Sequence, residues 1–154
     1  MKIKVLILCT GNSCRSQMAE GVVRRYGSEN IEVFSAGSKP STVNKIAIKV
    51  MKEIGIDISG HRSKHVDEFK NISMDVVITV CDNAKESCPA YFGKAQKFHW
   101  GFPDPPHASE GTEEVVQEFL KVRDIIHEKF RRFCDNINTK SSHESSLKQE
   151  NSGS

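Results

Sequence analysis

Residues 3–16 read Ile-Lys-Val-Leu-Ile-Leu-Cys-Thr-Gly-Asn-Ser-Cys-Arg-Ser, and this stretch decides the fold. The apolar run from Ile3 to Leu8 predicts a buried strand. The pattern from Gln17 to Tyr26, with apolar side chains four positions apart, predicts a helix that packs on it. Small and polar residues form the loop between the two. The stretch therefore predicts the strand, loop and helix with which an α/β fold begins.

The loop has the composition of an oxyanion-binding site. Its backbone N–H groups can turn inward, the start of the helix adds the positive end of its dipole, and Arg15 can bind two oxygens of a tetrahedral anion. Such surroundings favour the thiolate form of Cys9 over the thiol. We therefore predict that Cys9 is a nucleophile at the floor of an anion-binding loop, whose members are Thr10, Gly11, Asn12, Ser13, Cys14 and Arg15.

Strands and helices alternate along the rest of the chain. The apolar patterns predict strands at 31–35, 74–80 and 97–100, a helix over 43–54, and a last helix that opens at Thr112 and ends in a basic turn. The alternation predicts one α/β domain over residues 1–134, with a four-stranded parallel, doubly wound sheet flanked by helices. From residue 135 to 154 the chain is polar apart from Leu147, which predicts a disordered tail.

The composition excludes several classes of protein. A chain of 154 residues with 37% hydrophobic residues suits a single core. No apolar run is long enough for a membrane span or a signal peptide, so we expect a cytoplasmic protein with no membrane partner. A net charge of +2 with short basic clusters argues against nucleic acid. Five cysteines in such a protein favour reactive thiols or a metal site over structural disulfides.

Cys81 and Cys88 lie at the two ends of a polar segment of six residues. They could be incidental cysteines of a surface loop. A metal site would need two further ligands, and although His99 and His107 are available, the intervals do not match a zinc finger or ribbon. A disulfide between them would require Cα atoms within about 7 Å, so the segment would have to bend or unwind. A polar segment with no apolar stripe can do so at little cost.

Three chemically active side chains follow the carboxyl ends of predicted strands: Cys9, Cys81 and Asp104. Because ligands of open parallel sheets sit beyond that edge, we predict a common site. Prolines around Asp104 limit the movement of its carboxylate, which we predict protonates a leaving oxygen. Ser16 can donate its hydroxyl to the Cys9 thiolate, cap the helix, or do both. The side chain of Cys14 is expected to point into the core.

With these residues in place, the chain resembles the low-molecular-weight tyrosine phosphatase superfamily and, within it, the thioredoxin-coupled arsenate reductases. The resemblance covers residues 3–133 and rests on the loop 9–20, on 35–37, on the pair Cys81 and Cys88, and on 100–105. The phosphatases of this superfamily need one catalytic cysteine, whereas these reductases use three. The cysteine pair therefore favours the reductases.

The resemblance implies a mechanism for the predicted site. Arsenate would enter the loop as a phosphate mimic, with phosphate or sulfate as analogues, and Cys9 would attack arsenic while Asp104 protonates the departing hydroxide. Cys81 would attack the sulfur of Cys9 and release arsenite. Cys88 would then attack Cys81, and thioredoxin would reduce the resulting disulfide. We expect a monomer with no bound cofactor or metal.

Two departures from the family pattern bear on these expectations. Some relatives bind potassium through residues that correspond to Asn12, Glu20, Ser35 and an acidic residue, but here Lys64 replaces the last. Its ammonium can occupy the position of the cation, so we predict no potassium dependence. His107 stands where tyrosine phosphatases often carry an aromatic side chain, which disfavours stacking on phosphotyrosine.

Two other hypotheses remain open at this stage. The first is a low-molecular-weight phosphatase in which Cys81 and Cys88 protect Cys9 from oxidation. The second is a protein without catalytic activity that senses an anion or binds a metal through the same thiols.

Overall fold

The computed structural model describes residues 2–81, 92–106 and 111–152, with the backbone alone for 141–152. Its strands are β1 (Ile3–Cys9), β2 (Ile31–Gly37), β3 (Val76–Thr79) and β4 (Gln96–His99), and its helices are α1 (Arg15–Tyr26), α2 (Lys45–Glu53), α3 (Glu113–Ser152) and the 3₁₀ helices η1 (Ser28–Asn30) and η2 (Val66–Phe69). Each predicted strand and helix is present, with small shifts at the ends. Within the described residues, no helix combines the length and the apolar character that crossing a membrane requires.

The four strands form one parallel sheet in the order β2-β1-β3-β4. The predicted fold class is therefore confirmed. The register places Cys9 opposite Gly37 of β2, and Leu8 opposite Thr79 of β3. Because all strands run the same way, their carboxyl ends meet at the edge of the sheet where Cys9 lies.

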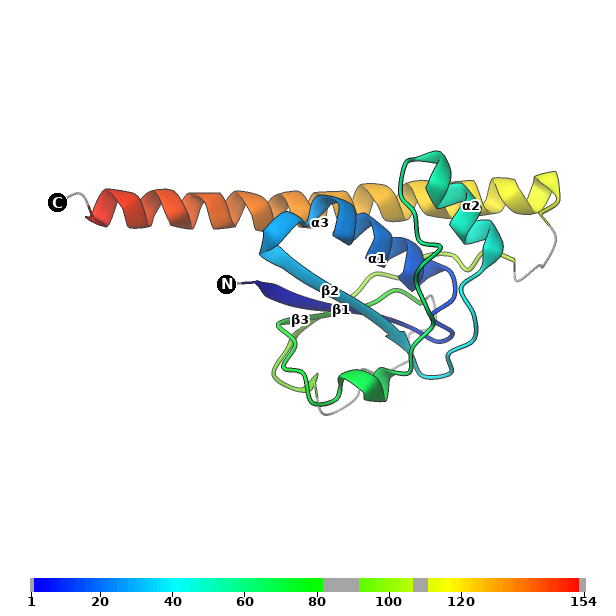
Figure 1. Ribbon diagram of the computed structural model, residues 1–154, viewed down its shortest axis with the longest axis horizontal. Coiled ribbons are helices and arrows are strands. Elements are labelled where there is room, and N and C mark those ends of the chain that lie inside the picture. The colour runs from blue at the N-terminus through cyan, green and yellow to red at the C-terminus, as the bar shows by residue number, and fades with distance from the viewer. Residues whose placement is uncertain (1, 82–91, 107–110, 153–154) are drawn as a thin grey trace.

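The two faces of the sheet are covered differently. Val5 and Ile7 of β1 join the larger apolar core, which α1, α2 and α3 cover from one side (Figure 1). Leu6 and Leu8 point to the other face, where η2 and Phe92 pack over a smaller core. In the described part of the chain, this second layer contains a 3₁₀ helix in place of the α-helix typical of a doubly wound sheet.

The last helix differs from the expectation of a disordered tail from residue 135. α3 continues to Ser152, and its final turns extend past the amino ends of the strands (Figure 1). Two side chains beyond 134 explain why the helix does not stop at the basic turn. Ile137 packs against the larger core. Asn138 Nδ2 donates to the carbonyl of Tyr26 at 3.0 Å, and Asn138 Oδ1 accepts from Asn30 at 2.9 Å.

Candidate active site

The loop between β1 and α1 has its carbonyls turned outward. Thr10, Gly11 and Ser13 carbonyls accept hydrogen bonds from backbone N–H groups of Lys39, Ser41 and Asn44 at 2.9, 3.0 and 3.1 Å. The Asn12 carbonyl accepts from Ser63 Oγ at 2.6 Å. In a trans peptide the N–H points opposite to the carbonyl. The N–H groups of residues 11, 12, 13 and 14 are therefore turned to the inner side of the loop. Consecutive inward N–H groups of this kind bind an oxyanion.

Asn12 holds this arrangement from within. Its φ of +48° is in the left-handed region, which asparagine tolerates better than most residues. Its side-chain amide, fully buried, donates to Ser16 Oγ at 2.8 Å and Ser35 Oγ at 2.9 Å. The amide oxygen accepts from Gln17 Nε2 and from the Lys64 N–H, both at 2.9 Å. All hydrogen-bonding positions of the amide are used, so the loop is fixed to α1, β2 and the segment before η2.

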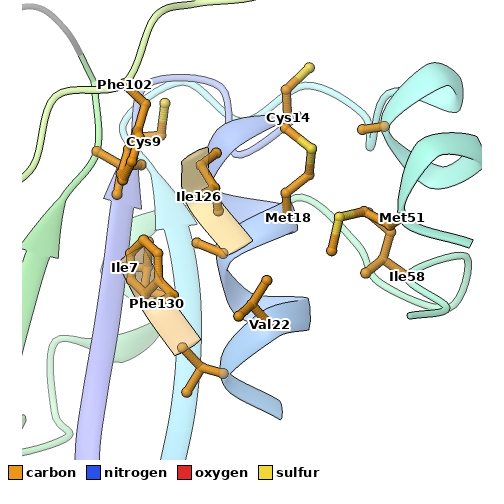
Figure 2. Close-up of a cluster of buried hydrophobic side chains, with 14 of the residues drawn as sticks. Ile7, Cys9, Cys14, Met18, Val22, Met51, Ile58, Phe102, Ile126 and Phe130 are labelled. Atoms are coloured by element: carbon orange, nitrogen blue, oxygen red, sulfur yellow. The ribbon is translucent and has the colours of Figure 1, made fainter. Parts of the chain in front are cut away.

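The two thiols predicted at this edge lie in contact. Cys9 and Cys81 are both buried and reduced, and Cys81 Sγ donates to Cys9 Sγ at 2.9 Å. The backbone N–H of Thr10 donates to Cys81 Sγ at 3.2 Å, which holds the second thiol against the loop. Figure 2 shows Cys9 at the end of β1 beside Phe102. Cys88, the third predicted thiol, lies outside the described residues.

Arg15 and Asp104 also come together, as the convergence of strand ends predicts. Arg15 is the first residue of α1, and its guanidinium donates to the carbonyl of Phe102 at 3.0 Å. Its other terminal nitrogen lies 3.5 Å from Asp104 Oδ1. The guanidinium is buried, whereas a third of the Asp104 side chain is exposed. The segment after β4 therefore places a partly accessible carboxylate beside the arginine of the anion-binding loop.

The structure gives Ser16 a different contact from the predicted cap. Ser16 is the second residue of α1, the cap residue is Cys14, and no side chain caps this end of the helix. Instead, the Ser16 hydroxyl accepts from Asn12. Cys14 is buried and belongs to the larger core, as predicted, and Figure 2 shows it above Met18. Burial raises the pKa of the Cys14 thiol to about 11, so this thiol stays protonated and is a poor nucleophile.

A buried group of polar side chains lies behind the loop. Glu20 and Ser35 belong to the cation site that the sequence comparison considers, whereas the sequence predicts no role for His61, which also joins the group. Glu20 Oε2 lies 3.1 Å from His61 Nδ1, and Glu20 Oε1 accepts from Ser35 Oγ at 2.8 Å. His61 Nδ1 is also 3.0 Å from Gln17 Oε1. The sequence signal that could have indicated His61 is the His-x-Ser segment at 61–63, because Ser63 bonds the loop at the Asn12 carbonyl.

The electrostatics of this group are set by burial. Burial lowers the pKa of His61 below its ordinary value, against an opposing effect of Glu20. Burial likewise lowers the pKa of Lys64, again opposed mainly by Glu20. The Lys64 ammonium lies 3.7 Å from Glu20 Oε1 and donates to the Arg62 carbonyl at 2.8 Å. Among the described residues, here or elsewhere, no group of three His, Cys, Asp or Glu side chains could hold a metal ion.

Comparison with known proteins agrees with this geometry. The family model of the low molecular weight phosphotyrosine protein phosphatases matches residues 4–143. An arsenate reductase of Halalkalibacterium halodurans is 44% identical over 85% of this chain and 94% of its own length. An arsenate reductase of Bacillus subtilis is 41% identical over the same shares of the two chains. A solved arsenate reductase in the phosphate binding state is 35% identical, with a TM-score of 0.77 over 89% of this chain and 99% of the other. The chain belongs to the low molecular weight phosphotyrosine protein phosphatase family.

Proposed function

We propose that this protein reduces arsenate to arsenite, with Cys9 as the nucleophile and Cys81 as the second thiol. One observation carries the proposal: the two sulfurs lie 2.9 Å apart at the floor of the anion-binding loop. Hydrolysis of a phosphate ester needs one thiol and water. A second thiol held against the first by the Thr10 N–H supports sulfur-to-sulfur chemistry instead. The similarity to arsenate reductases at 41 to 44% identity supports the same conclusion.

Arsenate binds first, in the loop. The inward N–H groups and the Arg15 guanidinium hold its oxygens and stabilise charge that develops on them. The Cys81 thiol donates to Cys9, which favours the thiolate on Cys9. The Cys9 thiolate attacks arsenic, an S–As bond forms, and hydroxide leaves as water after Asp104 supplies its proton.

The redox step transfers two electrons from sulfur to arsenic. Cys81 loses its proton to an oxygen on arsenic and, as thiolate, attacks the sulfur of Cys9, so that a Cys9–Cys81 disulfide forms as the S–As bond breaks. The electron pair of that bond stays on arsenic, which leaves as arsenite in the +3 state. Cys88 then attacks Cys81, and the Cys9 thiolate departs. A dithiol protein of the thioredoxin class reduces the remaining Cys81–Cys88 disulfide by thiol exchange.

The test is arsenite production by the full chain with thioredoxin, thioredoxin reductase and NADPH. Cys9→Ser is expected to form no arsenite. Cys88→Ser is expected to form one equivalent of arsenite per chain and then stop, with a Cys9–Cys81 disulfide in a non-reducing peptide map. Cys134→Ala is the matched control. Its thiol is buried in α3, where burial raises the pKa to about 12, so turnover should continue as in the parent.

Two results would contradict the proposal. Sustained turnover by Cys88→Ser would rule out the three-thiol relay. Fully reduced thiols and no arsenite after one equivalent of arsenate, together with hydrolysis of an aryl phosphate, would support the phosphatase instead. Hydrolysis of the aryl phosphate alone does not distinguish the two, because both reactions use the loop, Arg15 and an acid.

We also propose that potassium does not activate the enzyme. The Lys64 ammonium lies 3.7 Å from the Glu20 carboxylate, beside Asn12 and Ser35, where a cation would have to bind. Turnover should be equal in potassium and sodium salts at one ionic strength. The variant Lys64→Asp exchanges the ammonium for a carboxylate, and potassium should raise its activity and its melting temperature. Activation of the parent by potassium over sodium would refute this proposal.

A further inference from the structure

A pocket lies at the end of the sheet opposite to Cys9, away from the anion-binding loop. Its volume is about 700 Å³, within the size range of small-molecule sites. Ile3, Val76 and Gln96, the first residues of β1, β3 and β4, form its floor. The turns of α3 between Lys129 and Lys140 form its roof. The continuation of α3 beyond the basic turn supplies three of the lining residues, Asn136, Ile137 and Lys140.

The walls of this pocket are aromatic. Trp100 and Phe98 come from β4 and the residue after it, and their ring centroids are 5.7 Å apart. Phe133 of α3 meets Trp100 edge to face at 5.7 Å. All three side chains are only half-buried although they pack against the larger core. Aromatic surface that is left accessible inside a concavity is a site for an apolar ligand group.

The rim of the pocket is positively charged. Lys129, Arg132 and Lys140 line it, and none of its lining residues is Asp or Glu. Lys129 Nζ lies 4.6 Å from the centroid of the Trp100 ring. Arg132 is paired with Glu128 at 2.7 Å. Among the described residues, no carboxylate lies within ion-pair distance of Lys129 or Lys140. Two ammonium groups therefore line an apolar pocket with no carboxylate partner among the side chains that the structure describes, which end at Lys140.

We propose that this pocket binds an amphipathic organic carboxylate, the chemical class to which fatty acids belong. The apolar part would lie against Phe98, Trp100 and Phe133, and the carboxylate would pair with Lys129 and Lys140. The charge of the rim selects an anion over a neutral or cationic amphiphile. The inference is independent of arsenate chemistry, since none of these residues takes part in the proposed reaction.

The fluorescence of Trp100 provides a direct test, because the chain has one tryptophan. The full protein is titrated with dodecanoate below its micelle concentration, and with dodecanol and dodecyltrimethylammonium as neutral and cationic probes. Dodecanoate should give a saturable change with one ligand per chain, confirmed by calorimetry. The other two probes should bind at least about tenfold more weakly, as the loss of one charge-assisted contact predicts.

Three variants locate the site. Lys129→Met should weaken dodecanoate binding about tenfold, because it removes one cation but keeps the length of the side chain. Asn136→Phe should abolish binding, because this exposed lining residue of α3 would then fill the pocket. Lys121→Met removes an exposed cation elsewhere on α3 and should bind as the parent does. Thermal unfolding checks that each variant folds.

Several outcomes would overturn the proposal. They are equal affinity for dodecanoate and dodecanol, a response to dodecanoate that does not saturate, and unchanged dodecanoate affinity in a folded Asn136→Phe variant. Association into dimers that protects Trp100 and that dodecanoate does not reverse would also overturn it, since the occupant would then be a second copy of the chain.

Discussion

Asn12 determines the shape of the anion-binding loop through both its backbone and its side chain. The left-handed φ of +48° puts the peptides on either side into the orientation that turns their N–H groups inward. The buried amide then ties this turn to Ser16, Ser35 and Gln17. A residue at this position must tolerate a positive φ and satisfy buried donors and acceptors at once, a combination that asparagine provides.

The two requirements can be separated by a pair of substitutions. Asn12→Ala loses the hydrogen bonds and keeps an unfavourable φ, whereas Asn12→Gly loses the same bonds but tolerates the φ. We expect Asn12→Ala to lose about 3 kcal/mol of unfolding free energy, mostly from buried polar groups left unpaired. Asn12→Gly should be about 1 kcal/mol more stable than Asn12→Ala. Urea unfolding measures both, and a glycine variant no more stable than the alanine variant would contradict the role of backbone strain.

His61 should make the stability of the protein depend on pH. Burial holds its pKa in the folded protein below 6.5, while Glu20 opposes this effect and Lys64 and Arg24 add to it. As the pH falls through about 6.5, the unfolded chain binds a proton at this imidazole before the folded protein does. The unfolding free energy should therefore decrease as the pH falls from this value to the lower folded pKa, and then become independent of this group.

The variant His61→Gln tests this assignment, because glutamine has no proton to gain. Urea unfolding at about pH 8 and about pH 5.5 should show a smaller loss of stability in the variant than in the parent. An equal loss in both proteins would mean that another group is responsible.

The convergence of the candidate site residues could be predicted from the sequence where it depends on strand ends. Cys9, Cys81 and Asp104 each follow a strand, and parallel strands bring their carboxyl ends together. The contacts of Gln17 and His61 could not be predicted in this way. The two residues are 44 positions apart, and His61 lies between α2 and η2 in a segment with no helix or strand, whose end pairs with β2 through His65 and Gly37. Neither spacing nor hydrophobic pattern carries that information.

At the scale of elements, the contact between β2 and the anion-binding loop depends on Gly37. This residue pairs with Cys9 in the sheet and, on its other side, with the Lys64 carbonyl and His65. A Cβ at Gly37 would lie 2.7 Å from the Cys9 carbonyl oxygen and would also contact the carbonyl of Thr10. Both neighbours are backbone atoms of the loop, so they cannot move without changing its shape.

We therefore expect Gly37→Ala to reduce both stability and activity. Overpacking against the backbone should cost about 1 to 3 kcal/mol of unfolding free energy, and the displaced loop should raise the KM for arsenate. The control is Gly60→Ala, because a Cβ there has no atom within 4 Å. It should change stability by less than about 0.5 kcal/mol. Unfolding curves and steady-state kinetics of both variants provide the measurement, and a Gly37→Ala variant as active as Gly60→Ala would refute it.

The sequence predicts that each helix exists, but it does not predict where α3 ends. The polar composition of α3 after residue 134 indicates too little apolar surface to form a core, and most of this part of the helix is indeed polar. What the composition does not reveal is the partner of Asn138. Its side chain bonds the carbonyl of Tyr26, the last residue of α1, and so satisfies a carbonyl that α1 itself leaves unpaired. Together with the packing of Ile137, this contact extends the packed part of α3 by about a turn.

At the scale of the whole molecule, α3 connects two regions with different roles. Its first half packs over the core beneath the anion-binding loop, and its later turns cover the amino ends of the strands (Figure 1). The described side-chain contacts of α3 with the sheet and α1 reach Asn138, and the family match ends at residue 143. The part of α3 needed for stability should therefore end close to these positions.

Two truncations test where that limit lies. A chain that ends at residue 143 keeps Ile137 and Asn138 and should unfold at the temperature of the parent. A chain that ends at 135 loses the packing of Ile137 and the hydrogen bonds of Asn138, and should lose about 2 to 4 kcal/mol of unfolding free energy. Asn138→Ala in the full chain separates the two contributions, because it removes only the hydrogen bonds and should cost about 1 to 2 kcal/mol. If the chain ending at 143 were as unstable as the chain ending at 135, α3 would draw its stability from beyond Asn138, and the polar segment would have to be part of the folded domain.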